Sequence, residues 1–80
     1  EGITELVENK LKSNENIRKY HDLKIRTAGA NTFIKVNIHF QPELDLTTIH
    51  IMCDNIEEEI KTAIPNSDVT VHAEPEDLKK

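Results

Sequence analysis

Glycine, cysteine and aromatic residues are scarce in this sequence, and each shortage excludes a class of site or fold. The 80 residues include two Gly, one Cys, one Tyr, two Phe and no Trp. Two glycines are too few for a glycine-rich phosphate loop or a dinucleotide-binding fingerprint. The single cysteine, Cys53, excludes an internal disulfide and fits a reducing compartment. The core must therefore be built mostly from Ile, Leu and Val.

Long apolar runs and an excess of positive charge are missing as well. No stretch of about 18 apolar residues and no signal-peptide pattern occurs. Ten Lys and Arg stand against fifteen Asp and Glu, for a formal net charge of −5. Nucleic acid and anionic membranes need clustered cations, so both are poor partners for the domain, and cations are favoured as ligands. No nucleophile–base pair stands out, so we do not expect an enzyme.

Hydrophobic periodicity predicts five elements in one small α+β domain. Apolar residues at helical spacing indicate a helix over residues 2–13, and alternating residues indicate strands over 17–28 and 31–41 joined by a turn at 28–31. A second helix is expected over 46–64, with Asp45 as its N-cap and Ala63 or Ile64 at the end of its apolar stripe. The last strand is expected over 68–74.

This α-β-β-α-β order predicts a ferredoxin-like fold. The first two strands should form an antiparallel hairpin, and the strand–helix–strand crossover should place the second and third strands parallel. The result is a mixed three-stranded sheet with both helices on its apolar face. The other face would carry Asn37, His39, His72 and Glu74, with nothing in the chain to cover it.

That uncovered face holds metal-ligand residue types. The strand period of two puts His72 and Glu74 on one side, roughly 6.5–7 Å apart along the backbone. His50 lies at the edge of the second helix's apolar stripe, and Asp54 follows one turn later as a partner that would orient the imidazole. His21 lies in the first strand. A site needs three or four such ligands, and a single histidine is more often a solvated residue.

Other polar or reactive residues have structural interpretations. Cys53 occupies a core position of the second helix and is expected to pack as a small apolar residue. The run "EEE" (57–59) is expected to be mainly solvated, and residues 76–80 to form a fraying tail beyond a core of about residues 3–75.

The order and spacing of several motifs resemble the C-terminal cytoplasmic domain of the cation diffusion facilitator family, which exports zinc and related divalent metals. The resemblance covers about residues 3–75, and it is carried by four segments: His21-Asp22-Leu23-x-x-Arg26-x-x-Gly29, "FIKVNIHF", Leu46-x-x-x-His50, and Pro65-x-x-Asp68-Val69-x-Val71-His72-x-Glu74-Pro75. The family's domain has the metallochaperone-like α-β-β-α-β fold, in agreement with the predicted order.

The resemblance also implies a site and a partner. The family's domain lies below a six-helix membrane portion on the cytoplasmic side, forms a homodimer, and binds regulatory metal near the dimer interface. Its metal ligands match His21, His50, His72 and Glu74. Some zinc-transporting members have another histidine where this chain has Asn37, and amides are poor zinc ligands. His39 points to the same face but lies two residues further along. We expect one metal near His50, His72 and Glu74, and a weaker one involving His21.

The resulting hypothesis is that residues 1–80 form a single cytoplasmic regulatory domain of a divalent cation efflux transporter, with Zn²⁺ as the expected ion. Two other hypotheses stay open from the sequence. One is a stand-alone metal chaperone or buffer, and the other is a ferredoxin-like regulatory domain that senses a small molecule without metal.

Overall fold

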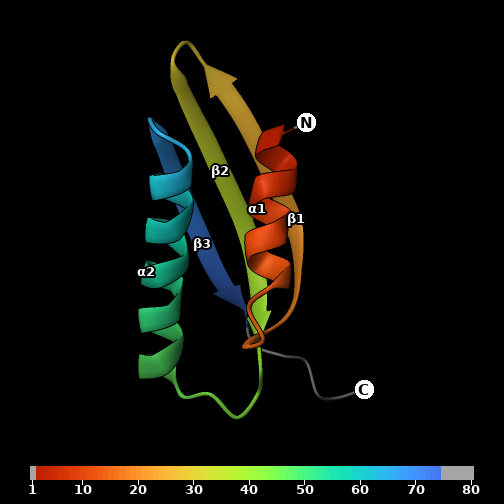
Figure 1. The fold of residues 1–80 in the computed structure, drawn as a ribbon. Coiled ribbons are helices and arrows are strands. Elements are labelled where there is room, and N and C mark those ends of the chain that lie inside the picture. The colour runs from red at the N-terminus through yellow and green to blue at the C-terminus, as the bar shows by residue number, and fades with distance from the viewer. Residues whose placement is uncertain (1, 75–80) are drawn as a thin grey trace.

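The computed structural model describes residues 2–74; residue 1 and residues 75–80, which include the predicted tail, lie outside the described part. The elements follow the predicted order, and each boundary falls within one residue of its predicted position. They are α1 (Gly2–Lys12), β1 (Ile17–Ala28), β2 (Asn31–Phe40), α2 (Leu46–Ala63) and β3 (Ser67–Glu74) (Figure 1). None of the helices in residues 2–74 is long and apolar enough to cross a membrane.

The three strands form one mixed sheet in the order β1-β2-β3. β1 pairs with β2 in an antiparallel hairpin, and β3 pairs with β2 in parallel, as predicted. Gly29 is the first residue of the two-residue hairpin loop and has a φ of 62°, a conformation that glycine adopts without steric cost. β2 is therefore the central strand, and its side chains have neighbours on both sides.

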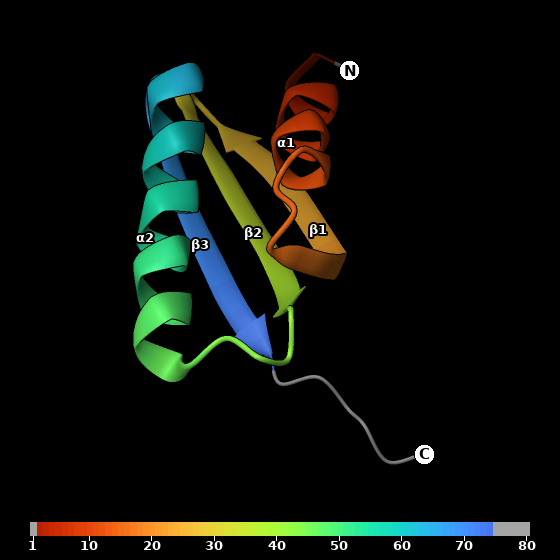
Figure 2. The same ribbon diagram turned by 60° about the horizontal axis from the view of Figure 1, so that its bottom comes forward.

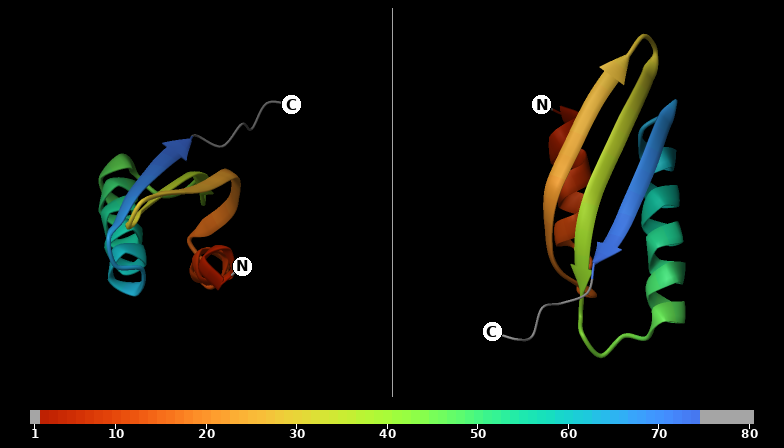
Figure 3. Two further views of the ribbon diagram at one scale, coloured as in Figure 1. Left: turned by 90° about the horizontal axis from the view of Figure 1, so that it is seen from above. Right: turned by 180° about the vertical axis from the view of Figure 1, so that it is seen from behind.

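Both helices pack on one face of the sheet, which confirms the predicted layers (Figures 2 and 3). Alternate β2 residues, from Ile34 to Phe40, meet buried residues of the two helices, and each fully buried aliphatic side chain stabilises the fold by roughly 1.5–3 kcal/mol. Ile64, rather than the exposed Ala63, closes the end of this core. The buried apolar set is Val7, Leu11, Ile34, Val36, Ile38, Phe40, Ile56, Ile60, Ile64 and Val69.

Two carboxylates of the α2 region form hydrogen bonds that hold the fold: one caps the start of α2, and the other links α2 to the edge strand β3. Asp45 caps α2 as predicted, because its side chain accepts a hydrogen bond from the Thr48 backbone N–H at 2.9 Å. Hydrogen bonding to the side chain and then to the backbone of Thr48 lowers the pKa of the Asp45 carboxyl. Glu57 is not simply solvated, because its Oε2 accepts the Val71 backbone N–H at 3.0 Å. β3 is an edge strand, so this bond satisfies a donor that would otherwise face solvent.

Candidate metal centre

The sheet face opposite the helices carries the polar residues that the sequence placed there. Figure 3 shows this outer face uncovered by either helix. The strand register arranges its residues in transverse rows, one of which is His21–Asn37–His72 and the next Lys19–His39–Glu74. Three histidines and a carboxylate from three different strands are thereby brought within reach of one another.

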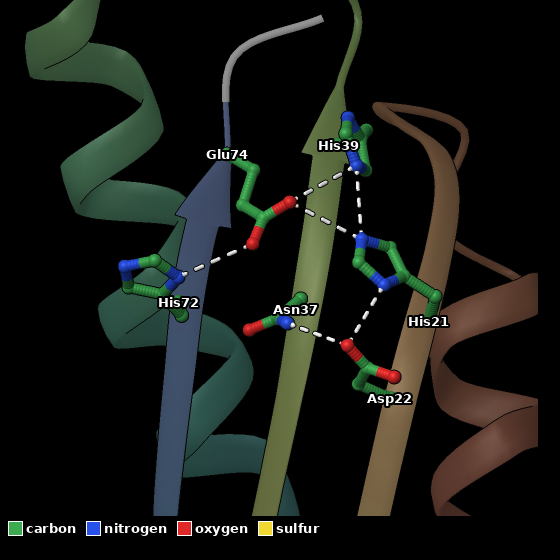
Figure 4. Close-up of polar contacts among 6 residues, drawn as sticks. All are labelled: His21, Asp22, Asn37, His39, His72 and Glu74. Carbon is green, nitrogen blue, oxygen red and sulfur yellow. Dashed lines mark hydrogen bonds and ion pairs between the residues drawn. The ribbon is translucent and has the colours of Figure 1, made fainter.

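The centre of this arrangement is a cluster of His21, His39 and Glu74. The Nε2 atoms of the two histidines lie 3.1 Å apart, and each is close to the same Glu74 oxygen, Oε1, at 3.2 Å for His21 and 3.3 Å for His39 (Figure 4). The imidazole planes are tilted by 34°, with ring centroids 5.1 Å apart. Three potential ligand atoms therefore converge on one point of the outer face.

A bulge in β1 directly follows His21. The pairing of β1 with β2 shifts register between His21 and Lys24, and Asp22 within the bulge has a φ of 56°. Positive φ is uncommon outside glycine, but Asp and Asn tolerate it better than other residues. Bulges redirect side chains and occur often next to functional sites. Here the bulge residue Asp22 lies beside the imidazole of His21.

Asp22 also contacts the far side of the His21 ring. Its Oδ2 lies 3.2 Å from His21 Nδ1 and accepts a hydrogen bond of 3.2 Å from the side-chain amide of Asn37 (Figure 4). An imidazole held at Nδ1 by a carboxylate presents its Nε2 outward, which is the usual arrangement behind metal-binding histidines. Asn37, the departure from the family's histidine pattern, thus supports the carboxylate that orients His21.

His72 lies beside the cluster and contacts the other oxygen of the carboxylate. Its Nδ1 is 3.6 Å from Glu74 Oε2, while Oε1 faces His21 and His39. Glu74 therefore lies between the pair His21 and His39 on one oxygen and His72 on the other. This placement suits a carboxylate that can be shared between two ions.

His50 lies away from the cluster, on α2. Its closest charged partner is Asp54, the residue predicted to orient it, with Nε2 and Oδ2 3.7 Å apart and both side chains well exposed, at 80% and 64%. His50 lines a groove of about 630 Å³ with Leu46, Ile49, Cys53, Val71 and Ala73. Val71 and Ala73 belong to the helix-covered side of β3, so one copy of the chain groups His39, not His50, with His21 and Glu74.

Cys53 lines the same groove without the properties of a metal ligand. Burial raises the pKa of its thiol, and the carboxylates of Glu57 and Asp54 raise it further. A metal binds the thiolate, so a thiol that stays protonated near neutral pH binds poorly. This agrees with the expectation that Cys53 packs as a small apolar residue, since it lies against the core cluster.

The cluster fits a divalent transition metal by its donor chemistry. Two imidazole nitrogens and a carboxylate oxygen are ligands that zinc accepts, and zinc sites with three protein ligands leave a fourth position open. Within residues 2–74 the only group of three or more His, Cys, Asp or Glu side chains with converging ligand atoms is His21, His39 and Glu74. Two of these three residues belong to the ligand set that the resemblance implies.

The fold is that of a small ferredoxin-like domain with a cluster of potential ligand side chains on its uncovered sheet face. Residues 1–76 match the model of the cation efflux protein cytoplasmic domain. The chain therefore belongs to this family, the cytoplasmic domains of the cation diffusion facilitators.

Curated relatives and solved structures agree with this assignment. The cation-efflux pump FieF of Klebsiella pneumoniae is 36% identical over 59 residues, which cover 74% of this chain and 20% of the relative. This chain thus spans a fifth of the length of that relative. A structure of the transporter CzrB is 28% identical, with a TM-score of 0.84 and coverage of 92% of this chain and 93% of the other.

A more distant neighbour shows the same fold. The metal-bound C-terminal domain of the CzcD transporter from Thermotoga maritima is 22% identical, with a TM-score of 0.87 over 98% of this chain and 93% of the other. At this level of identity the likeness shows the fold alone. The family's domain is a transporter module rather than a known class of enzyme.

Sequence reasoning missed one contributor to the site, Asp22, which occurs in the sequence motif but turns toward His21 only through the bulge. His39 was expected on the correct face as a possible additional ligand, and its contact with His21 depends on the register of β1 against β2. The adjacent pair His21-Asp22 was the signal in the sequence that could have indicated a bulge here, because Asp is one of the few residues that accept a positive φ.

Proposed function

We propose that residues 1–80 act as one metal-sensing and dimerisation domain of a divalent cation efflux transporter, on the cytosolic side of the membrane that holds the parent protein. The observation that carries this proposal is the cluster of His21, His39 and Glu74, whose ligand atoms meet on an uncovered sheet face. Such a cluster has no role in the core. The domain binds the ion as a signal and catalyses no reaction.

Zinc is the ion that we propose. The donor set of imidazoles and a carboxylate suits zinc, although iron(II), manganese and cobalt accept the same ligands. A second structure of the transporter CzrB, in its zinc form, is 26% identical to this chain. The cation-efflux relatives support a cation as the cargo of the parent protein.

A second copy of the chain is the partner that we propose. His21, His72 and Glu74 lie on the sheet, whereas His50 lies exposed on α2 near Leu46 and Ile51, which are 83% and 52% exposed. Contiguous exposed apolar patches often mark contact surfaces, and these two residues line one groove with His50. In this arrangement the ligand His50 lies close to the interface between the copies.

Metal would then couple the two copies. Two copies of a chain with a net charge of −5 repel each other, and their outer faces both carry Glu74. A bound divalent cation reduces this repulsion and supplies a shared partner. An ion that binds the closed arrangement better than the open one shifts the population toward it, by as much as its difference in affinity.

Sedimentation velocity and light scattering on the isolated chain test this proposal. We expect zinc to change the mass or compactness of the wild type relative to chelator-treated protein, and the double variant His50→Ala/His72→Ala to lose the response. Protein that binds zinc with no change in mass, shape or stability would instead be a metal buffer. Protein that does not respond to zinc would instead support the hypothesis of a small-molecule sensor, and the apolar groove beside α2 offers a site for such a molecule.

A further inference from the structure

We infer that His39 is a direct metal ligand and completes, with His21 and Glu74, a three-ligand site within a single copy of the chain. The inference rests on the proposed metal-binding function and deepens it. It identifies which side chain replaces the histidine that is missing at Asn37. It also identifies the atoms that bind, because the two imidazoles face the same carboxylate oxygen through their Nε2 atoms.

The spacing of the three donor atoms is the first argument. Tetrahedral zinc with bonds of about 2.0–2.2 Å holds its ligand atoms about 3.3–3.6 Å apart. The triangle formed by His21 Nε2, His39 Nε2 and Glu74 Oε1 has sides of 3.1, 3.2 and 3.3 Å. Its sides are therefore close to one face of a zinc tetrahedron, and only small side-chain rotations separate the two.

The position of His39 on the central strand is the second argument. It stands directly across from Glu74 in the parallel pair and from Lys19 in the antiparallel pair. Its side chain is 12% exposed, against 42% for His21 and 29% for Glu74. A sheltered imidazole loses little rotational freedom on binding, so its ordering costs little when the ion arrives.

The contacts of Asn37 are the third argument. Its amide nitrogen donates to Asp22 Oδ2, and the same oxygen contacts His21 Nδ1. Asn37 therefore acts behind the ligands, where an amide is useful, rather than at the metal, where it is a poor zinc ligand. The donor that β2 supplies to the cluster is therefore His39, two residues from Asn37 on the same face of the strand.

This arrangement has a consequence for stoichiometry. All three donors come from one chain, so one ion can bind without a second copy. Zinc affinity at this site should not depend on protein concentration, and it should survive loss of His50, which lies outside the cluster.

Nitrogen-resolved NMR of the histidine side chains tests the inference directly. We expect the Nε2 resonances of His21 and His39 to shift on addition of one equivalent of zinc to chelator-treated protein. The Nδ1 of His21 should remain protonated against Asp22. A His39 Nε2 resonance that stays in place while zinc binds would overturn the inference, even if every variant failed to fold.

Substitution with matched controls provides the second test, with zinc affinity measured by competition against a chromophoric chelator. His39→Asn should lower the affinity by more than the roughly 10–100-fold that loss of an outer partner costs. Lys35→Gln is the control, because Lys35 is exposed on the same strand and face outside the cluster. Equal affinity of His39→Asn and Lys35→Gln would refute the role of His39.

The two proposals fail in different ways. If zinc changes the mass of the protein but neither the His39 resonance nor His39→Asn responds, the His39 site is wrong and the sensing function stands. If zinc binds through His39 without any change in mass, shape or stability, the sensing function is wrong and the site stands. If zinc does not bind at all, both are wrong.

Discussion

The outer sheet face and the first half of α2 each hold histidine beside a carboxylate, but they differ in how completely one chain organises them. On the sheet, three strands bring two imidazoles to one carboxylate oxygen, and Asp22 orients one of the rings. On α2, His50 has a charged contact with Asp54, one turn away, and both side chains are largely in solvent.

This difference separates two tasks of a metal-responsive domain. The sheet cluster is preorganised by strand pairing, so its residues can bind an ion at low cost in side-chain entropy. His50 and Asp54 form an exposed i, i+4 pair, an interaction that contributes little by itself. The cluster is therefore suited to capture the ion within one copy, and His50 to respond to a neighbour.

The largest effect should come from Glu74, the only residue in the described range 2–74 that contacts three histidines through its two oxygens. Glu74→Gln keeps the size of the side chain but removes the negative charge that attracts the ion. We expect zinc binding to the isolated chain to fall below detection in a calorimetric titration. Retention of wild-type affinity would show that the sheet cluster is not the site of capture.

The second effect should come from Asp22, which acts on the cluster through His21. Asp22→Asn keeps a residue that tolerates the positive φ of the bulge, so the fold should be preserved. We expect zinc affinity to fall roughly 10–100-fold. Chelator competition measures this change, and circular dichroism checks the fold. An affinity equal to that of wild type would mean that the Asp22 contact does not orient the ring in solution.

A third prediction concerns His50, the exposed histidine on α2. His50→Ala should leave zinc affinity of the sheet cluster unchanged and should weaken the zinc-dependent change in mass or shape. Sedimentation velocity and chelator competition on the same sample measure both. Asp54→Asn, which removes the charge that His50 contacts, should have the same pattern with a smaller amplitude. Loss of affinity in His50→Ala would mean that one copy cannot complete the site.

The smallest effect concerns the cap of the helix that carries His50. Hydrogen bonding to the side chain and the backbone of Thr48 lowers the pKa of Asp45 in the folded chain, so the ionised carboxyl favours folding. This contribution is fully present above about pH 4 and is lost as the pH falls through the lowered folded value. Thermal melts of metal-free protein from pH 3 to 7 measure it.

Asp45→Asn supplies the control for that measurement. Asn is also a good N-cap but does not titrate. The acid-dependent loss of stability should therefore be smaller in this variant than in the wild type. Identical pH profiles for the two proteins would show that Asp45 does not contribute to the acid response of the fold.

Most of the fold could be predicted because its signals are local. The alternation of Ile34, Val36 and Ile38 marks a half-buried central strand, and Asp45 marks a helix start. The connection lengths then leave few arrangements for three strands and two helices. Only Glu57 departed from the expected solvated run, because its bond to Val71 requires knowledge of which strand lies at the sheet edge.

The candidate site was predictable only in part. The period of two placed His39, His72 and Glu74 on one face, and the family pattern added His21 and His50 as predicted ligands. Which of these meet was not predictable, since contacts between strands depend on register. The bulge at Asp22 changes that register locally, and a local sequence pattern does not reveal where it occurs.

By itself, the sequence determined the order of the elements, the identity of the core face and the family of the domain, because hydrophobic period, capping and motif spacing are properties of neighbouring residues. Tertiary structure alone decided that His39 joins His21 and Glu74, that Asn37 supports Asp22, and that His50 lies apart. Those outcomes depend on how residues far apart in the chain are paired across strands, and a shift of one residue in that pairing would place each side chain on the opposite face.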